Sequence, residues 1–315
     1  NKKSDTLLFY IQYGKKDFFC NQSKMTRIYH DLAAIATTTS PEKQNKTLAL
    51  LEKLGYTSFA TEKVIQASKI HTLRQMISTS TSSSSTSSSS STHKRKRTTS
   101  TASKDTSSPS SSSSAPTATI QHLQRITIQL TRTNDFDLIG SSTSKHLEKY
   151  DIIAAMPTTE EAFVAACSRE DLDLIAIDVS CRLQFRPKPA QVSQAIERGV
   201  YFELRYSGSL QSETCRSYFM DNVKTFVRIC RGRGIICSSA SKELFNVRGH
   251  HDIANLMCLC GVKGMERALM FVSENCTRVV ERAKLRRRSK IAKRVQEEGG
   301  EGGREGNSGA KKSKT

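Results

Sequence analysis

The segment RGHHDIANLMCLCG, residues 248–261, gathers two histidines, an aspartate and a Cys-x-Cys pair. Imidazole and thiolate groups at short spacing are typical of zinc sites. The segment also predicts a helix that begins at Asp252 and stops at Gly261. On such a helix Cys258 and Cys260 lie about 200° apart and cannot share one tetrahedral metal ion. The spacing therefore favours an entry loop and a core helix over a zinc site.

A second chemistry open to this chain is that of a metal-dependent hydrolase, which needs histidine and carboxylate ligands at the ends of several strands. No two histidines flank a single residue anywhere in the chain. The alternative for the carboxylates is a polar layer inside the fold, paired with a neighbour such as Arg205 or Arg248, and we favour that alternative for Asp178 and Glu203. The candidate ligands are His30, Asp31, Asp178, Glu203, and either His250 or His251.

The third chemistry is phosphate binding by basic side chains. The chain carries a net charge of +19, which favours a polyanionic partner such as nucleic acid. Residues 119–280 hold 20 basic and 18 acidic side chains, so most of the excess lies outside them. Phosphate contacts require only Arg and Lys presented on one surface. The candidate RNA-binding residues are Arg182, Arg186, Lys188, Arg205, Arg228, Arg231, Arg233, Arg248, Arg286, Arg287 and Arg288.

Segments of biased composition divide the chain. Residues 78–119 contain 30 Ser or Thr among 42, a composition that buries too little apolar area to fold, so we expect a disordered insertion over 72–118. Within it HKRKR suggests a nuclear import signal formed by Lys94, Arg95, Lys96 and Arg97. We expect residues 281–315 to be a basic, largely disordered tail and residues 1–24 to be an upstream extension. One globular domain is then expected over 25–280.

Within that domain, short β-branched runs alternate with segments of helical period, the pattern of a parallel sheet. A capping box of Thr158 and Glu161 marks one helix start, and Ser40, Pro41 and Gly55 delimit another helix. The predicted helices cover 40–55, 158–170, 189–199 and 213–232. The predicted strands cover 27–32, 56–61, 125–130, 151–156, 172–179, 200–206 and 234–239.

Seven such units predict an α/β, TIM-barrel-like fold with about seven parallel strands, with an open doubly wound sheet as the competitor. Neither G-x-G-x-x-G after the first strand nor G-x-x-x-x-G-K-[ST] occurs, so nucleotide binding has no support. No apolar run is long enough to span a membrane. Nine scattered cysteines without a secretory signal suggest reduced thiols, and therefore cytosol or nucleus.

Several of these stretches, taken in order, carry a family resemblance. The most specific are ERGVYFELRYS (197–207), GRGIICSSAS (232–241) and NVRGHHDIANL (246–256), and YDIIAAMPTTEEAFVAAC (150–167) supports them. Together they resemble the thirty-kilodalton protein subunit of ribonuclease P over about 25–280. Relatives commonly have Pro-Tyr in place of His250-His251 and apolar residues in place of both cysteines, which again speaks against a metal site.

The resemblance implies a barrel related to metal-dependent phosphoesterases and a place in the ribonucleoprotein that removes the 5′ leader of precursor tRNA. It implies as partners ribonuclease P RNA, the RNase MRP RNA that acts on precursor ribosomal RNA, a small subunit of the Pop-five type, and precursor tRNA indirectly. Catalytic Mg²⁺ is then expected at the RNA, with no cofactor bound by the protein. The expected location is the nucleus, with the nucleolus as the compartment within it.

Three functions therefore remain: a ribonucleoprotein subunit that is not catalytic alone, a metal-dependent phosphoesterase, and a pure protein-interaction scaffold. The first is the function that the sequence favours. It needs no catalytic or metal-binding residue in the protein. The scaffold is compatible with the first function, and the sequence does not indicate which helix would face a partner.

Overall fold

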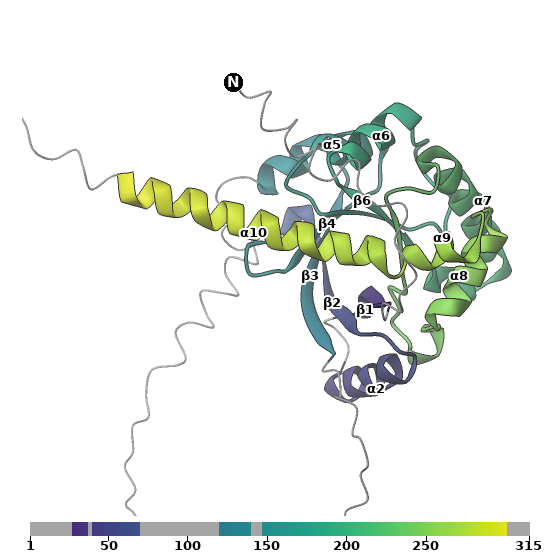
Figure 1. The fold of residues 1–315 in the computed structure, drawn as a ribbon. Coiled ribbons are helices and arrows are strands. Elements are labelled where there is room, and N and C mark those ends of the chain that lie inside the picture. Colours follow the sequence, from purple (N-terminus) through teal and green to yellow (C-terminus); the bar gives the residue numbers. More distant parts are fainter. Residues whose placement is uncertain (1–26, 37–39, 70–119, 140–146, 301–315) are drawn as a thin grey trace, which may run out of the picture.

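Seven parallel strands form one sheet in the order of the chain, β1 to β7 (Figure 1). The structure is a computed structural model and describes residues 27–36, 40–69, 120–139 and 147–300. Every predicted strand is present, with its ends shifted by a few residues, and the TIM-barrel-like fold is confirmed. The strands are β1 (His30–Ala36), β2 (Ser58–Gln66), β3 (Gln121–Leu130), β4 (Ile152–Pro157), β5 (Leu174–Ile177), β6 (Tyr201–Arg205) and β7 (Ile235–Ser238).

The barrel is closed between β7 and β1 by a segment that is not a strand. The backbone N–H of Cys237 in β7 donates to the carbonyl of Phe271, at 2.9 Å, and that of His30 in β1 donates to the carbonyl of Val272, also at 2.9 Å. Two consecutive carbonyls thus satisfy backbone donors on both open edges of the sheet, and an unpaired buried edge would be costly.

Helices surround this sheet (Figure 1). The capping box is displaced by one residue, because Thr159 and not Thr158 accepts the backbone N–H of Ala162. Residues 248–261 also form their helix three residues earlier than predicted, with Gly249 as N-cap instead of Asp252. The helices are α2 (Pro41–Lys53), α5 (Glu160–Ser168), α6 (Pro189–Glu197), α7 (Glu213–Cys230), α8 (His250–Leu259), α9 (Met265–Met270) and α10 (Glu274–Gly300).

Helix α10 covers the end of the barrel at which the strands begin (Figure 1). Its buried Cys276, Val279, Val280 and Ala283 pack against apolar side chains from the first halves of the strands, among them Leu32, Ala60, Leu123, Ile152, Leu174 and Ile236. Burial of this face stabilises the helix against the barrel. The barrel therefore opens to solvent mainly at the other end, where the strands end and the connecting loops follow.

The domain boundary predicted at residue 280 is corrected, because α10 runs through it to Gly300. The predicted tail is thus helical over 281–300, and its side chains pack against the barrel as far as Arg287. The upstream extension 1–24, the insertion 72–118 with its import signal, and residues 301–315 lie outside the described residues and stay predictions. Among the helices that the structure describes, none is long and apolar enough to cross a bilayer.

Candidate nucleic-acid interface

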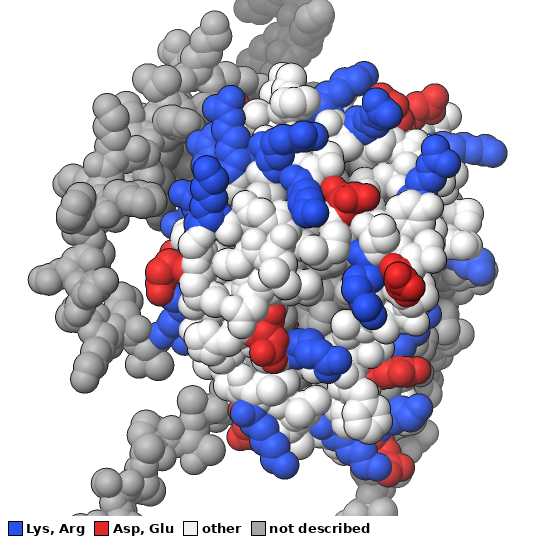
Figure 2. All heavy atoms as spheres, turned by 90° about the vertical axis from the view of Figure 1, so that its right-hand side faces the viewer, with Lys and Arg blue, Asp and Glu red and all other residues white. Residues whose placement is uncertain are grey.

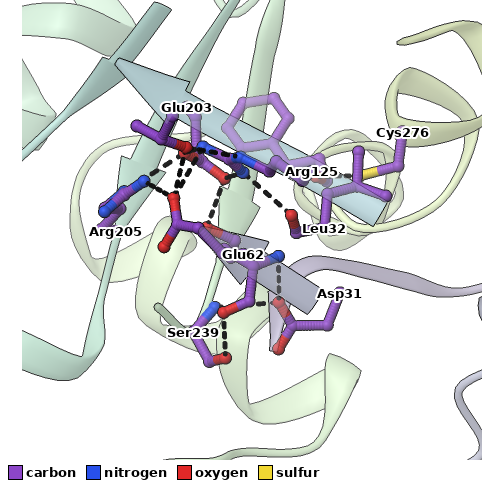
Figure 3. Close-up of polar contacts among 12 residues, drawn as sticks. Asp31, Leu32, Glu62, Arg125, Glu203, Arg205, Ser239 and Cys276 are labelled. Carbon is purple, nitrogen blue, oxygen red and sulfur yellow. Dashed lines mark hydrogen bonds and ion pairs between the residues drawn. The ribbon is translucent and has the colours of Figure 1, made fainter. Parts of the chain in front are cut away.

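Two arginines and two glutamates meet inside the barrel (Figure 3). The alternation of strand side chains places Arg125 and Thr127 on the inner face of β3, and Glu62 lies opposite Arg125 on β2. From β6, Glu203 and Arg205 point to the same interior. Glu203 lies between the two guanidinium groups in Figure 3. We call these four residues, Glu62, Arg125, Glu203 and Arg205, the interior ion-pair network.

Nearly all polar atoms of this network have partners. Arg125 donates to both carboxylate oxygens of Glu203 and to the carbonyl of Leu32, the last at 2.9 Å. Arg205 joins Glu62 to Glu203. The hydroxyl of Thr127 donates to Glu62 at 2.5 Å, and that of Ser238 donates to Glu203 at 2.7 Å. Because the charges are balanced and hydrogen-bonded, they are tolerated without solvent.

The electrostatics follow from this pairing. Burial would raise the pKa of Glu203, but Arg125 and Arg205 outweigh it and bring the pKa down to about 2. Burial would lower the pKa of Arg125, but Glu203 and Glu62 raise it above its ordinary value. Both groups are thus charged at neutral pH. A carboxylate held by two guanidinium groups is a poor general base, since its proton affinity is low.

The candidate metal ligands do not gather at one site around the interior ion-pair network. The prediction of a paired interior carboxylate is confirmed for Glu203 with Arg205, whereas Arg248 lies outside the network. Asp178 is exposed and accepts hydrogen bonds from Ser180, so the interior placement predicted for it is wrong. Asp31 is buried and accepts the backbone N–H of Ser239 at 3.2 Å, and burial raises its pKa.

The histidines are engaged elsewhere. His30 is bonded through its two ring nitrogens to Ser58 in β2 and to Thr277 in α10. His250 stacks on Tyr29 with ring centroids 3.7 Å apart and faces the carbonyl of Leu54. In the part of the chain that the structure describes, no three His, Cys, Asp or Glu side chains are placed to hold a metal ion.

Cys258 and Cys260 both pack against the main core, and Cys260 is the C-cap of α8. Cys260 is buried, and its Sγ contacts the sulfur of Met220 at 3.3 Å. Cys258 is half-buried and packs against the main core. Both serve the packing of α8 against the barrel.

Four of the predicted RNA-binding residues lie in loops at the open end of the barrel. Arg182 and Arg186 are exposed in the segment that follows β5, and Arg248 is exposed after β7. Lys188 is exposed and forms an ion pair with Glu160 at 3.2 Å. The connections that follow the strands carry the functional residues of β/α barrels. We call Arg182, Arg186, Lys188 and Arg248 the open-end group.

A second group lies at the opposite end. Arg228 and Arg231 end α7, and Arg233 precedes β7; all three are exposed. Sequence reasoning missed Arg267 of α9, which is exposed and whose Cδ lies 3.3 Å from the place that a β-carbon on Gly232 would take. Figure 2, which faces the α7–α9 side, shows basic side chains gathered at its upper left and a broad uncharged centre. Arg228 and Arg231 also complement the C-terminal dipole of α7.

Two predicted contacts are corrected. Arg205 belongs to the interior ion-pair network and is 12 % exposed. Arg286 is 8 % exposed because it forms a bidentate pair with buried Asp173. Arg287 pairs with Asp151 and is 36 % exposed, so its role in RNA binding stays a prediction. The positions of these acids, more than a hundred residues from α10, are set by the barrel. Of the predicted arginines in α10, Arg288 is the exposed one.

Sequence reasoning also missed Arg125 and Phe245. The sequence held a signal for Arg125. In RITIQL the alternation of a strand places Arg125 and Thr127 on one face and Ile126 and Ile128 on the other. The sequence held none for Phe245, because an aromatic residue in a loop is more often buried than exposed. In the structure its side chain is 84 % exposed.

Taken together, these features define a β/α barrel of the TIM type whose interior charges neutralise one another and whose loops carry basic side chains. A sequence model of the RNase P subunit p30 family matches residues 28–288. The chain belongs to that family.

Individual relatives agree with this assignment. Mouse ribonuclease P protein subunit p30 is 38 % identical over 160 residues, which are 51 % of this chain and 59 % of the mouse protein. The RNase P/MRP protein subunit RPP1 of Saccharomyces cerevisiae is 28 % identical over 141 residues, 45 % of each chain. The matched part therefore spans about half the length of these relatives.

The fold agrees as well. A chain in the cryo-EM structure of archaeal ribonuclease P with mature tRNA superposes with a TM-score of 0.51 at 11 % identity, over 81 % of this chain and 91 % of that chain. At this identity the likeness concerns the fold.

Proposed function

We propose that the protein is a subunit of a ribonuclease P ribonucleoprotein and supports the RNA that removes the 5′ leader from precursor tRNA. Family membership over residues 28–288 supports the proposal, as do the names of the mouse and yeast relatives. The exposed open-end group supplies the cations that phosphate contacts need.

The interior ion-pair network is the observation that carries the proposal beyond family likeness. A barrel enzyme keeps its reactive groups where the strands end. Here the interior beneath that end holds Glu203, in the middle of β6, with a pKa of about 2 and locked between Arg125 and Arg205. Such a core favours a binding role for the barrel over hydrolysis by its own side chains.

Four finer features belong to the same proposal. The protein serves RNase MRP as well, in line with the name of the yeast relative. A small subunit of the Pop-five type is its immediate protein partner. Mg²⁺ acts at the RNA. The complex works in the nucleus and nucleolus, reached through the basic run Lys94–Arg97.

The experiment is purification of the tagged full-length chain from its own cells, followed by sequencing of the RNA that accompanies it. The proposal expects an RNase P RNA and, for the shared role, an MRP RNA. A matched variant, Arg182→Ala with Arg186→Ala, changes two exposed side chains and should recover less of either RNA. Recovery of neither RNA by the wild-type protein would overturn the proposal.

A further inference from the structure

Phe245 stands out among the exposed apolar side chains. It is 84 % exposed, compared with 70 % for Leu259 and 54 % for Ile291. It lies in the short 3-10 turn Leu244–Asn246, in the loop that connects β7 to α8 at the open end of the barrel. An aromatic side chain left in water forgoes the favourable free energy of burial, so its position invites a functional explanation.

The turn that carries Phe245 is held firmly. The hydroxyl of buried Tyr56 donates to the carbonyl of Arg248 at 3.0 Å, and the N–H of Arg248 donates to the hydroxyl of buried Tyr206 at 2.9 Å. Val247 is buried beside Leu51. Phe245 is therefore presented on a fixed backbone, which lowers the entropy cost of using it for binding.

The guanidinium group of Arg248 lies beside the backbone of Phe245. Nη1 of Arg248 donates to the carbonyl of Phe245 at 2.5 Å, and the remainder of this side chain is exposed. Lys242 and Glu243, at the start of the same loop, are also exposed, so the loop carries a net charge of +1. An exposed aromatic ring and a free guanidinium edge thus come from one rigid turn.

We propose that Phe245 stacks on an unpaired base of a bound RNA while Arg248 contacts an adjoining phosphate. The inference rests on the proposed function, because it takes RNA as the partner. Unpaired bases are recognised by stacking on aromatic side chains, and phosphates by arginine. The polar neighbours of Phe245 suit a single base better than an apolar pocket of a protein, which would need further apolar contacts around the ring.

The absence of tryptophan from the chain provides a direct test. The full-length Phe245→Trp variant carries one tryptophan, whose fluorescence is quenched when a base stacks on it. We expect saturable quenching by a short oligouridine and much less by a duplex RNA of the same length. The matched Leu259→Trp variant, exposed on α8, should stay unquenched. Equal quenching of both variants, or none at Phe245→Trp, overturns the proposal.

Affinity measurements complete the test. Phe245→Ala should weaken binding of oligouridine roughly 5-fold to 100-fold, the range expected for the loss of one stacked base. Phe245→Tyr should retain affinity, whereas Phe245→Leu should lose it, because Leu is apolar without a π-face. If Leu binds as well as Phe, stacking is excluded. Should Phe245→Ala still recover wild-type amounts of RNase P RNA and bind oligouridine normally, the stacking proposal fails while the proposed function stands. Should the wild-type protein recover none, the proposed function itself fails.

Discussion

Nη2 of Arg125 lies 2.5 Å from Oε2 of Glu203 at the centre of the barrel, where neither side chain is exposed to solvent. The two residues come from β3 and β6, so their ion pair spans the interior. It fills the interior beneath the end at which a barrel hydrolase would place reactive groups, and it gives that interior a structural role.

Loss of one member of this pair should be costly. Glu203→Gln removes the charge but keeps the shape, and it leaves Arg125 without its main counter-ion. We expect the free energy of unfolding to fall by about 3 kcal/mol, as measured by urea denaturation. The exposed pair of Lys46 and Glu42 provides the control, since Glu42→Gln should cost about 0.5 kcal/mol or less. A Glu203→Gln protein as stable as the wild type would contradict the structural role of the pair.

His30 predicts a pH dependence of stability. Burial, with a smaller effect of Lys284, lowers its pKa from 6.5 to about 4. The unfolded chain therefore takes up this proton at a higher pH than the folded protein does, and the contribution of His30 is complete above pH 6.5 and lost as the pH falls towards 4. From pH 7 to pH 5, the melting temperature should decrease less for His30→Gln than for the wild type. His251→Gln, at an exposed position, should keep the wild-type decrease in melting temperature. An identical decrease in all three proteins would exclude the contribution of His30.

The arginines of α10 should differ in how much they contribute to stability. Arg286→Ala leaves buried Asp173 unpaired and should lower the free energy of unfolding by about 3 kcal/mol. Arg288→Ala, two residues further on and exposed, should change it by less than about 0.5 kcal/mol. Denaturation of both variants under the same conditions checks this difference. Similar losses would mean that α10 does not dock as described.

The two basic ends of the barrel should differ in RNA binding. Arg182→Ala with Arg186→Ala should weaken binding to RNase P RNA and lower the slope of log affinity against log salt concentration by about 2, roughly one unit per phosphate contact. Arg231→Ala with Arg233→Ala, at the opposite end, should change the slope less. A salt titration of the purified full-length variants compares them. A larger change in slope for the Arg231 and Arg233 variant than for the Arg182 and Arg186 variant would place the RNA at the end covered by α10.

The sequence predicted the strands well because each is a short β-branched run between turn residues, a signal that does not depend on distant partners. Helix starts were less certain. Asp252 looked like the N-cap of α8, yet the backbone at Gly249 begins the helix and Asp252 lies in its first turn. Local capping preferences cannot separate these two arrangements, since an aspartate stabilises either position.

The site was harder to predict than the fold. Arg286 looks like a surface cation in the sequence, and only the closed barrel brings Asp173 against it. For Arg205 the sequence indicated Glu203 as a partner but not Glu62. Sequence spacing carries no record of such long-range pairs. Arg182 and Arg186 were easier, because a polar loop after a buried strand reaches the surface in any parallel barrel.

The protein, as we propose, supports an RNA catalyst and does not cleave precursor tRNA itself. The most direct test is cleavage of precursor tRNA by the purified native complex, before and after digestion of its RNA with a nuclease that is then inactivated. We expect removal of the 5′ leader before digestion and loss of this activity afterwards, with the protein still intact. Leader removal that persists after complete digestion, and that the isolated protein also performs with Mg²⁺, would contradict the proposal.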